Sequence, residues 1–251
     1  MTGTKIVKLR LDGGGQAERL PVLKNNLITT EEALRLYKDV RFQHEFADDR
    51  TKYYERIMEE LKGTDVMPEQ LQEIYDAMSG DFRSDTRNIP KTGLMVSALV
   101  QNSSRNDFSL KIGDFIPFLG FKLGKGKKLT VDGDVGDFTG ELMDGGTVHV
   151  LGEAGWRTGA WMKDGKIIVG LSTNSYTGWK MEGGEIIVED DVTSYLGSEM
   201  KAGRVHVKGS AGSEVGDKME GGTVEVDGGA QNVSANYKSG TIILQGLQVK
   251  P

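Results

Sequence analysis

The sequence predicts a mainly β protein, a right-handed parallel β-helix with 19-residue coils, preceded by an α-helical insertion that caps it. Two observations predict this fold. Methionines recur with a fixed 19-residue period, at Met143, Met162, Met181, Met200 and Met219. Glycines stand three places before and after each of them, and each later glycine leads into a β-branched run such as Ile167-Ile168-Val169. A fixed period of this length, made of a short strand and glycine turns, is typical of a solenoid.

The β-branched runs predict the strands of this solenoid, because apolar and variable residues alternate in them as in a half-buried strand. No helix fits, since glycines recur in every period and each costs roughly 1 kcal/mol in a helix interior relative to alanine. The sixth-position aliphatic pattern of left-handed hexapeptide helices and the leucine ladders of leucine-rich repeats are absent. A right-handed β-helix with methionine and β-branched ladders inside therefore remains. A partial copy at 129–131 and a degenerate copy at 240–244 flank the array.

Residues 1–107 form a different part of the chain, which we interpret as N-terminal strands plus a three-helix cap, and 108–251 form the glycine-rich β-helix. Alternation predicts a strand at 4–10, and 20–23 reads as a second extended piece. Thr29 and Glu32 form a capping box that opens the first helix, whose apolar stripe includes Phe46. Because the terminal coil of a solenoid exposes unpaired backbone groups, we expect these strands and helices to cover it.

Two more helices follow before the solenoid. One spans about 49–61 and stops at Gly63, and the next begins at Pro68 and ends at Gly80. The pattern leaves the conformation of residues 94–100 open. Residues 108–115 alternate cleanly and read as a strand that leads into the first coil.

The composition excludes several classes of function. The 251 residues contain no cysteine and three histidines, which excludes disulfides and thiolate metal sites and argues against a histidine-rich metal centre. A net charge of −6 argues against nucleic acid as a partner, because phosphate contacts require clustered Lys and Arg. No apolar stretch predicts a membrane span or a signal peptide, so we expect a cytoplasmic protein without membrane partners.

The sequence predicts no catalytic, cofactor-binding or metal-binding residue in this chain. Four carboxylates gather on adjacent coils, and we interpret them as a solvated corner because the same positions hold Trp, Ala or Ser in other coils: Asp137, Glu141, Asp144 and Glu153. His149 and His206 occupy the same repeat position three coils apart, about 14 Å along the rod, and so cannot share a metal ion.

The repeat does predict a partner interface. Ile168 and Ile187 take the outward position of two neighbouring strands, flanked by His149 and His206 in the same column. A second column, five places before each Met, is rich in aromatic residues and arginine, types enriched in the cores of interfaces. With nearby tryptophans, the corner candidates are Trp156, Arg157, Trp161, Tyr176, Trp179 and Tyr195. Phe138 and Tyr176 are equally compatible with an inward orientation.

The repeat, as in Gly140-Glu-Leu-Met-Asp-Gly-Gly-Thr-Val-His-Val, resembles the glycine-rich β-helix found in the C subunit of formylmethanofuran dehydrogenase and of formyltransferase/hydrolase complexes. The C-terminal domain of the glutamate synthase large subunit shares it. The lead-in at 110–115 and 129–135 resembles the approach to the first coil in the formylmethanofuran dehydrogenase family. The resemblance covers about 108–246, whereas the helical insertion at 28–92 departs from the family pattern.

The resemblance implies a non-catalytic scaffold subunit of a one-carbon complex. Its partners would be an amidohydrolase-like formyltransferase subunit and a pterin dehydrogenase subunit, and those chains would hold the binuclear metal and the tungsten or molybdenum pterin. Two rivals remain: a β-helix accessory subunit of a split glutamate synthase or N-methylglutamate synthase, and an autonomous carbohydrate-active β-helix enzyme.

Overall fold

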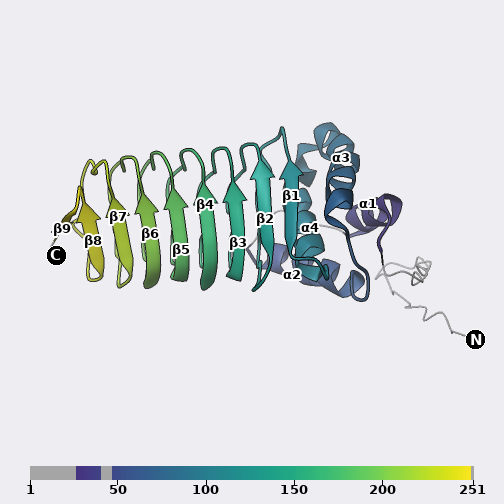
Figure 1. Cartoon of the computed structure of the whole chain (residues 1–251), viewed down its shortest axis with the longest axis horizontal. Helices are drawn as coiled ribbons and strands as arrows, with labels where there is room; N and C mark the ends of the chain where they lie inside the picture. Colours follow the sequence, from purple (N-terminus) through teal and green to yellow (C-terminus); the bar gives the residue numbers. More distant parts are fainter. Residues whose placement is uncertain (1–26, 41–46, 250–251) are drawn as a thin grey trace, which may run out of the picture.

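A computed structural model describes residues 27–40 and 47–249. The chain forms a rod of stacked strands with a cluster of helices packed on one end (Figure 1). This is the predicted parallel β-solenoid with 19-residue coils and a helical cap. The strand predicted at 4–10, the extended piece at 20–23 and Phe46 lie outside the described residues.

The helical part contains α1 (Thr30–Asp39), α2 (Ala47–Glu60), α3 (Pro68–Ser84), a short 3-10 helix η1 (Thr86–Asn88) and α4 (Ile89–Asn102). The capping box is confirmed, because the Thr29 hydroxyl accepts from the Glu32 N–H and the Glu32 carboxylate accepts from the Thr29 N–H. The predicted stop at Gly80 is wrong. The helix continues to Ser84, because one glycine in a helix interior costs only about 1 kcal/mol and does not by itself end a helix.

The segment that the sequence left open, 94–100, lies inside α4 and is buried throughout. No helix in the described part of the chain is both long enough and apolar enough to cross a membrane.

The strands form one sheet in chain order, parallel from β1 to β8. They are β1 (Asp107–Lys111), β2 (Lys128–Asp132), β3 (Asp144–Val150), β4 (Asp164–Val169), β5 (Glu182–Val188), β6 (Ala202–Val207), β7 (Thr223–Val226) and β8 (Thr241–Leu244). Strand β9 (Leu247–Val249) folds back antiparallel to β8. The strand predicted at 108–115 is too long, because the chain turns at Gly113 before Ile116 starts the next face of the coil.

The interior of the rod consists of the predicted ladders. The five repeat methionines are fully buried, and they stack between coils beside a column of β-branched residues that is also fully buried: Val148, Ile167, Ile186, Val205 and Val224. The coil that carries the predicted partial copy at 129–131 has a corner that the sequence pattern did not predict, with Phe118, Gly120 and Leu123 in the places of Phe138, Gly140 and Met143. Its spacing exceeds the regular period by one position and leucine replaces methionine, so the fixed period does not reveal it.

Side chains of the helices cap the first coil by hydrogen bonding to its backbone. The Gln72 side chain of α3 donates to the Lys111 carbonyl (3.0 Å) and accepts from the Lys111 N–H (2.8 Å), as a neighbouring strand would. The buried Ser97 hydroxyl of α4 donates to the Phe118 carbonyl (2.9 Å) and accepts from the Phe121 N–H (3.2 Å). These bonds satisfy groups at the end of the solenoid that would otherwise be exposed.

Two helical glycines test how tightly the cap is seated. A Cβ on Gly93 of α4 would lie 1.7 Å from the Pro117 carbonyl oxygen, so Gly93→Ala forces α4 away from the coil. We expect a loss of about 3 kcal/mol in the free energy of unfolding, measured by chemical denaturation.

Gly80→Ala in α3 is the matched control, because a Cβ there meets nothing within 4 Å. Alanine has the higher helix propensity, so we expect a gain of about 0.5–1 kcal/mol. Equal effects of the two substitutions would contradict the close seating of α4.

Candidate functional site

The outward face of the sheet carries the predicted apolar pair. His149, Ile168, Ile187 and His206 are paired strand to strand in one column across β3 to β6, and all of them are half-buried. Their neighbours in each strand point inward and are fully buried, as the two-residue alternation requires. Two isoleucines therefore lie side by side on the sheet surface, with a histidine on either side.

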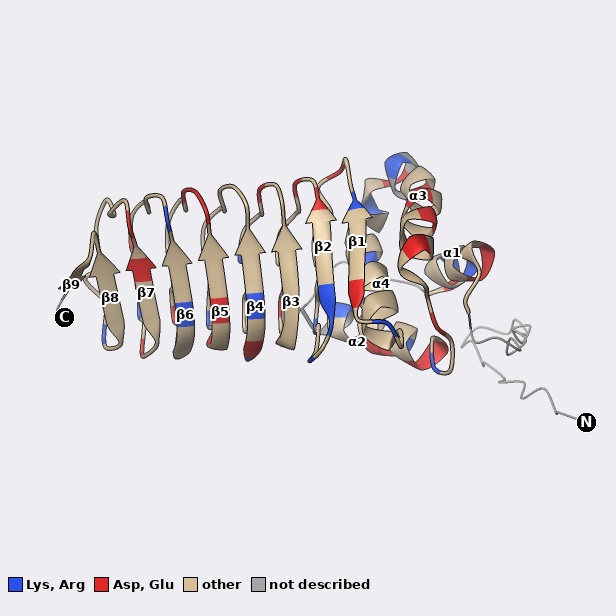
Figure 2. Ribbon diagram, in the orientation of Figure 1, with Lys and Arg blue, Asp and Glu red and all other residues tan. Residues whose placement is uncertain are grey.

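Charged residues surround this pair and neutralise one another within the chain. Lys166 contacts Glu185 at 2.8 Å, and Arg204 bridges Glu185 (3.2 Å) and Glu225 (2.6 Å). Hydrogen bonds from Lys166, with the nearby positive charge of Arg204, lower the pKa of Glu185. From β4 to β6 the sign of the charge alternates from one coil to the next, at Lys166, Glu185 and Arg204 (Figure 2). A polar rim around an apolar centre is the usual anatomy of a protein interface.

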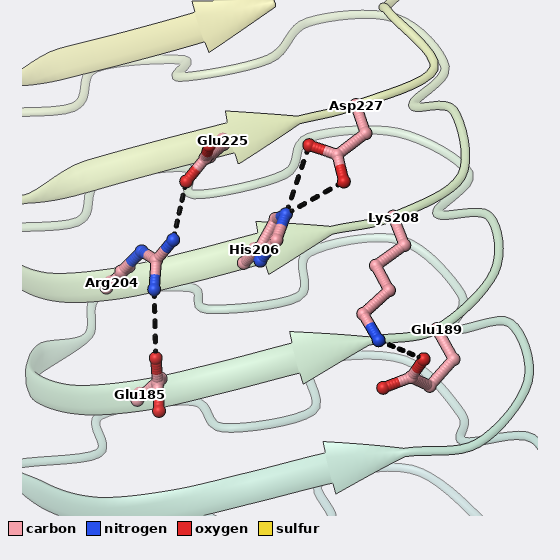
Figure 3. Close-up of polar contacts among 7 residues, drawn as sticks. All are labelled: Glu185, Glu189, Arg204, His206, Lys208, Glu225 and Asp227. Carbon is pink, nitrogen blue, oxygen red and sulfur yellow. Dashed lines mark hydrogen bonds and ion pairs between the residues drawn. The ribbon is translucent and has the colours of Figure 1, made fainter. Parts of the chain in front are cut away.

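The end of this face brings together three potential metal ligands, His206, Glu225 and Asp227, whose ligand atoms lie within 4.8 Å of one another (Figure 3). His206 Nε2 is 3.1 Å from both carboxylate oxygens of Asp227. The sequence prediction considered only the two histidines and missed this group, although Glu225 follows His206 at the repeat interval. Arg204 already binds Glu225, and His206 and Asp227 bind each other, so all three groups have a partner within the chain.

A second row of alternating charges follows the corner of the coils. Lys180 pairs with Glu199 (3.5 Å), Lys201 with Glu182 (3.0 Å) and Lys238 with Glu220 (2.7 Å). They line a groove of about 460 Å³ together with Trp161. Hydrogen bonds from the lysines lower the pKa values of Glu182 and Glu220. A glycosidase acid needs the opposite shift, so neither Glu182 nor Glu220 fits the role of such an acid.

The aromatic column forms a continuous stack next to this groove, here called the corner stack: Phe118, Phe138, Arg157, Tyr176 and Tyr195. All five residues have left-handed backbone angles, with φ between 57° and 65°. The Phe118 and Phe138 rings stack at 5.3 Å, and the Tyr176 and Tyr195 rings stack at 4.6 Å with an interplanar angle of 3°. The Arg157 guanidinium lies between the two pairs, 5.3 Å from Phe138 and 5.7 Å from Tyr176.

The predicted tryptophans join this corner. Trp156 is 47% exposed, and its ring lies 6.4 Å from Tyr176. The ring centroids of Trp161 and Trp179 lie 4.4 Å apart, and the Trp179 indole N–H donates to Glu199 at 3.1 Å. The structure thus gathers all six predicted corner residues, whereas Ile168, Ile187 and the two histidines belong to a different segment of the coil. Phe138 packs against the core, and Tyr176 stays half-buried in the stack.

The interpretation of the four carboxylates as a solvated corner is wrong for Glu141. Asp137, Asp144 and Glu153 are exposed, but the Glu141 side chain is 1% exposed. It forms an ion pair with Arg50 of α2, whose guanidinium also lies 4.9 Å from the Phe138 ring. Burial raises the pKa of the Glu141 carboxyl, and the hydrogen bond and charge of Arg50 oppose that shift. Because 91 residues separate the two partners, no local pattern could reveal the pair.

The fold and these surfaces together define a capped parallel β-solenoid with half-exposed apolar and aromatic residues on its middle coils. Comparisons with protein-family models, with curated proteins and with solved structures find no match for the chain.

The buried ion pair gives a test with a pH signature. Arg50→Met leaves Glu141 buried without its cation, and we expect a loss of about 3 kcal/mol in the free energy of unfolding at pH 7. An acid whose pKa is raised on folding favours the folded state most at low pH, and this advantage is lost as pH rises through the folded pKa. The loss should therefore shrink between about pH 7 and pH 4.

Adding Glu141→Gln to Arg50→Met should remove this pH dependence, because no ionisable group is left at the site. The measurement is urea denaturation of the single and double variants across that range. Lys122→Met is the control, because it breaks the exposed pair with Glu55 and should cost less than about 1 kcal/mol. If the free energies of unfolding of the single and double variants changed with pH in the same way, ionisation of Glu141 would not be the cause of the pH dependence.

Proposed function

We propose that this chain is a non-catalytic scaffold subunit that binds partner proteins through the outward face of its sheet. The observation that carries the proposal is the side-by-side placement of Ile168 and Ile187 inside a rim of internally paired charges. Burying an aliphatic side chain stabilises a complex by about 1.5–3 kcal/mol, while the rim charges need no partner from another chain.

The distribution of exposed apolar side chains supports the same part of the rod. Among the described residues, three of the five exposed large apolar side chains lie on the coils next to Ile168, at Leu151, Trp156 and Leu171, and the other two, Phe115 and Leu247, lie toward the two ends of the rod. The ion pairs of Lys201, Arg204 and Lys208 reach back to Glu182, Glu185 and Glu189 on the coil of Ile187, so charges flank the apolar side chains without replacing them. Interface cores are rich in apolar and aromatic residues within a polar rim, so the middle coils are the better contact surface.

The parent complex that we propose is of the formylmethanofuran dehydrogenase or formyltransferase/hydrolase type. This part of the proposal is supported by the resemblance of the repeat and of its lead-in to the β-helical subunit of that family. The formyl-transferring chemistry, the binuclear metal and the tungsten or molybdenum pterin would then reside on partner chains.

Purification of the complex through a tag on this chain, followed by mass spectrometry and metal analysis, tests the proposal. An amidohydrolase-like chain should co-purify with the metal of its binuclear centre, and a pterin protein would add tungsten or molybdenum. Glutamine amidotransferase and flavin iron–sulfur chains would instead favour the glutamate synthase system. A chain that purifies alone would contradict the scaffold role.

The face itself is tested by Ile168→Asp combined with Ile187→Asp. Two carboxylates buried without partners should weaken assembly at least about 100-fold, because each costs more than about 1.4 kcal/mol. The yield of co-purified partner and the dissociation constant measure this. The two carboxylates also lie directly opposite one another on adjacent strands, so the thermal midpoint of the isolated chain is measured alongside to separate a loss of folding from a loss of assembly.

The control is Thr130→Asp, which places a carboxylate in the same outward column on β2, outside the middle coils. It should leave assembly intact. Normal assembly of the double isoleucine variant would contradict the proposed contact face.

A further inference from the structure

The corner stack already binds one helix within this chain. Arg50 of α2 lies over Phe118 and Phe138, at 5.4 Å and 4.9 Å from the ring centroids, and pairs with Glu141. One turn later, the Tyr54 ring meets the edge of Phe121 at 5.1 Å. The corner therefore accepts a helix through a charged side chain set among aromatic rings.

The helix follows the rod axis, one turn for each coil. Arg50 reaches the second coil at Phe138, whereas Tyr54, four positions later, reaches the first coil at Phe121. A helical turn advances about 5.4 Å and neighbouring coils lie about 4.8 Å apart, so the two repeats match closely over a few turns. A second helix on the same line would meet one coil with each turn.

The corner stack continues beyond α2 without a described helix on it. Figure 1 shows α2 beside the helical end of the rod, while the coils of β4 to β6 lie farther along. There Trp156 is 47% exposed, and Tyr176 and Tyr195 are half-buried. The ring faces of Tyr176 are covered by Arg157 and Tyr195, which leaves edges rather than a flat platform for a sugar.

The charge of this continuation is the reverse of the part that α2 covers. Under α2, the solenoid supplies the carboxylate and the helix supplies the arginine. On the next coil the solenoid supplies Arg157, whose positive charge also acts on the buried Glu141. Arg157 forms no ion pair within 4.0 Å of any residue in the described ranges, and its Nε has no hydrogen-bond partner there. Its guanidinium is held by rings, 4.7 Å from Trp179. The complementary helix must bring an Asp or a Glu.

We propose that the corner formed by Trp156, Arg157, Tyr176 and Tyr195 binds a helix of a partner subunit. This helix spans about three turns, places a carboxylate on Arg157 and packs apolar side chains against Trp156 and Tyr195. The inference rests on the proposed scaffold function and adds a second contact, separate from the isoleucine face.

Site-specific photo-crosslinking tests the occupant in the assembled complex. Benzoylphenylalanine replaces Trp156, and in a control it replaces Phe115, which is 60% exposed and lies outside the corner. With the crosslinker at position 156, mass spectrometry should identify peptides from one partner helix that contains an acidic residue. With the crosslinker at position 115, no such peptide should appear. A crosslink to a second copy of this chain, to residues 1–26 or to no protein would overturn the proposal.

Charge reversal tests the pairing in the same complex. Arg157→Glu should weaken partner binding about 30-fold or more, and replacing the crosslinked acidic residue by Arg should restore it. Arg157→Gln, which keeps a planar polar group, should weaken binding less, and the thermal midpoint of each variant reports its folding. No restoration by the reversed pair would overturn the assignment.

The two proposals fail in distinguishable ways. If the complex assembles through Ile168 and Ile187 but position 156 yields no crosslink, the corner inference fails and the scaffold function stands. If no partner co-purifies with the intact chain, both fail.

Discussion

Everything in this protein depends on backbone contact between coils that repeat with one fixed period. Neighbouring coils are joined by backbone hydrogen bonds and lie close together. At the glycines three places after each repeat methionine there is no room for a side chain, because a Cβ would meet the backbone of the preceding coil. At Gly165, for example, that atom would lie 2.4 Å from the Gly146 carbonyl oxygen. The tight corners in turn set the stacking of every other position. Rings, methionines and charges therefore repeat as columns, and surface properties extend along the rod.

The helical end is attached to this array by a small number of specific contacts. Gly93 allows α4 to meet the Pro117 carbonyl, Gln72 substitutes for a missing strand, and Arg50 enters the aromatic corner to meet a buried carboxylate. Each contact joins the helices to the first coils rather than to one another. The cap and the solenoid consequently share one hydrophobic core, and the first coils derive part of their stability from the helices.

The sequence predicts the solenoid well because residues one period apart become spatial neighbours, so a long-range contact can be read as a local spacing. That rule located the methionine ladder, the column of Ile168 and Ile187 and the aromatic corner. It could not locate Arg50 on Glu141, since a helix outside the repeat supplies one partner. Nor could it extend α3 through Gly80, which the local pattern indicates as a stop although one interior glycine costs a helix only about 1 kcal/mol. The His206 group was within reach, because Glu225 follows at the repeat interval.

The alternating charges have a consequence for how the chain finds its correct pairing. Nearly identical coils could stack one unit out of register with their apolar ladders intact, since every coil offers the same methionine and valine positions. Such a slip would place Lys166 beside Arg204 and Glu182 beside Glu220, like charges at the distance of adjacent strands, where opposite charges now pair. Like charges directly opposite one another destabilise a sheet. The sign pattern thus alternates between odd and even coils, and it distinguishes neighbouring coils whose buried residues are nearly identical.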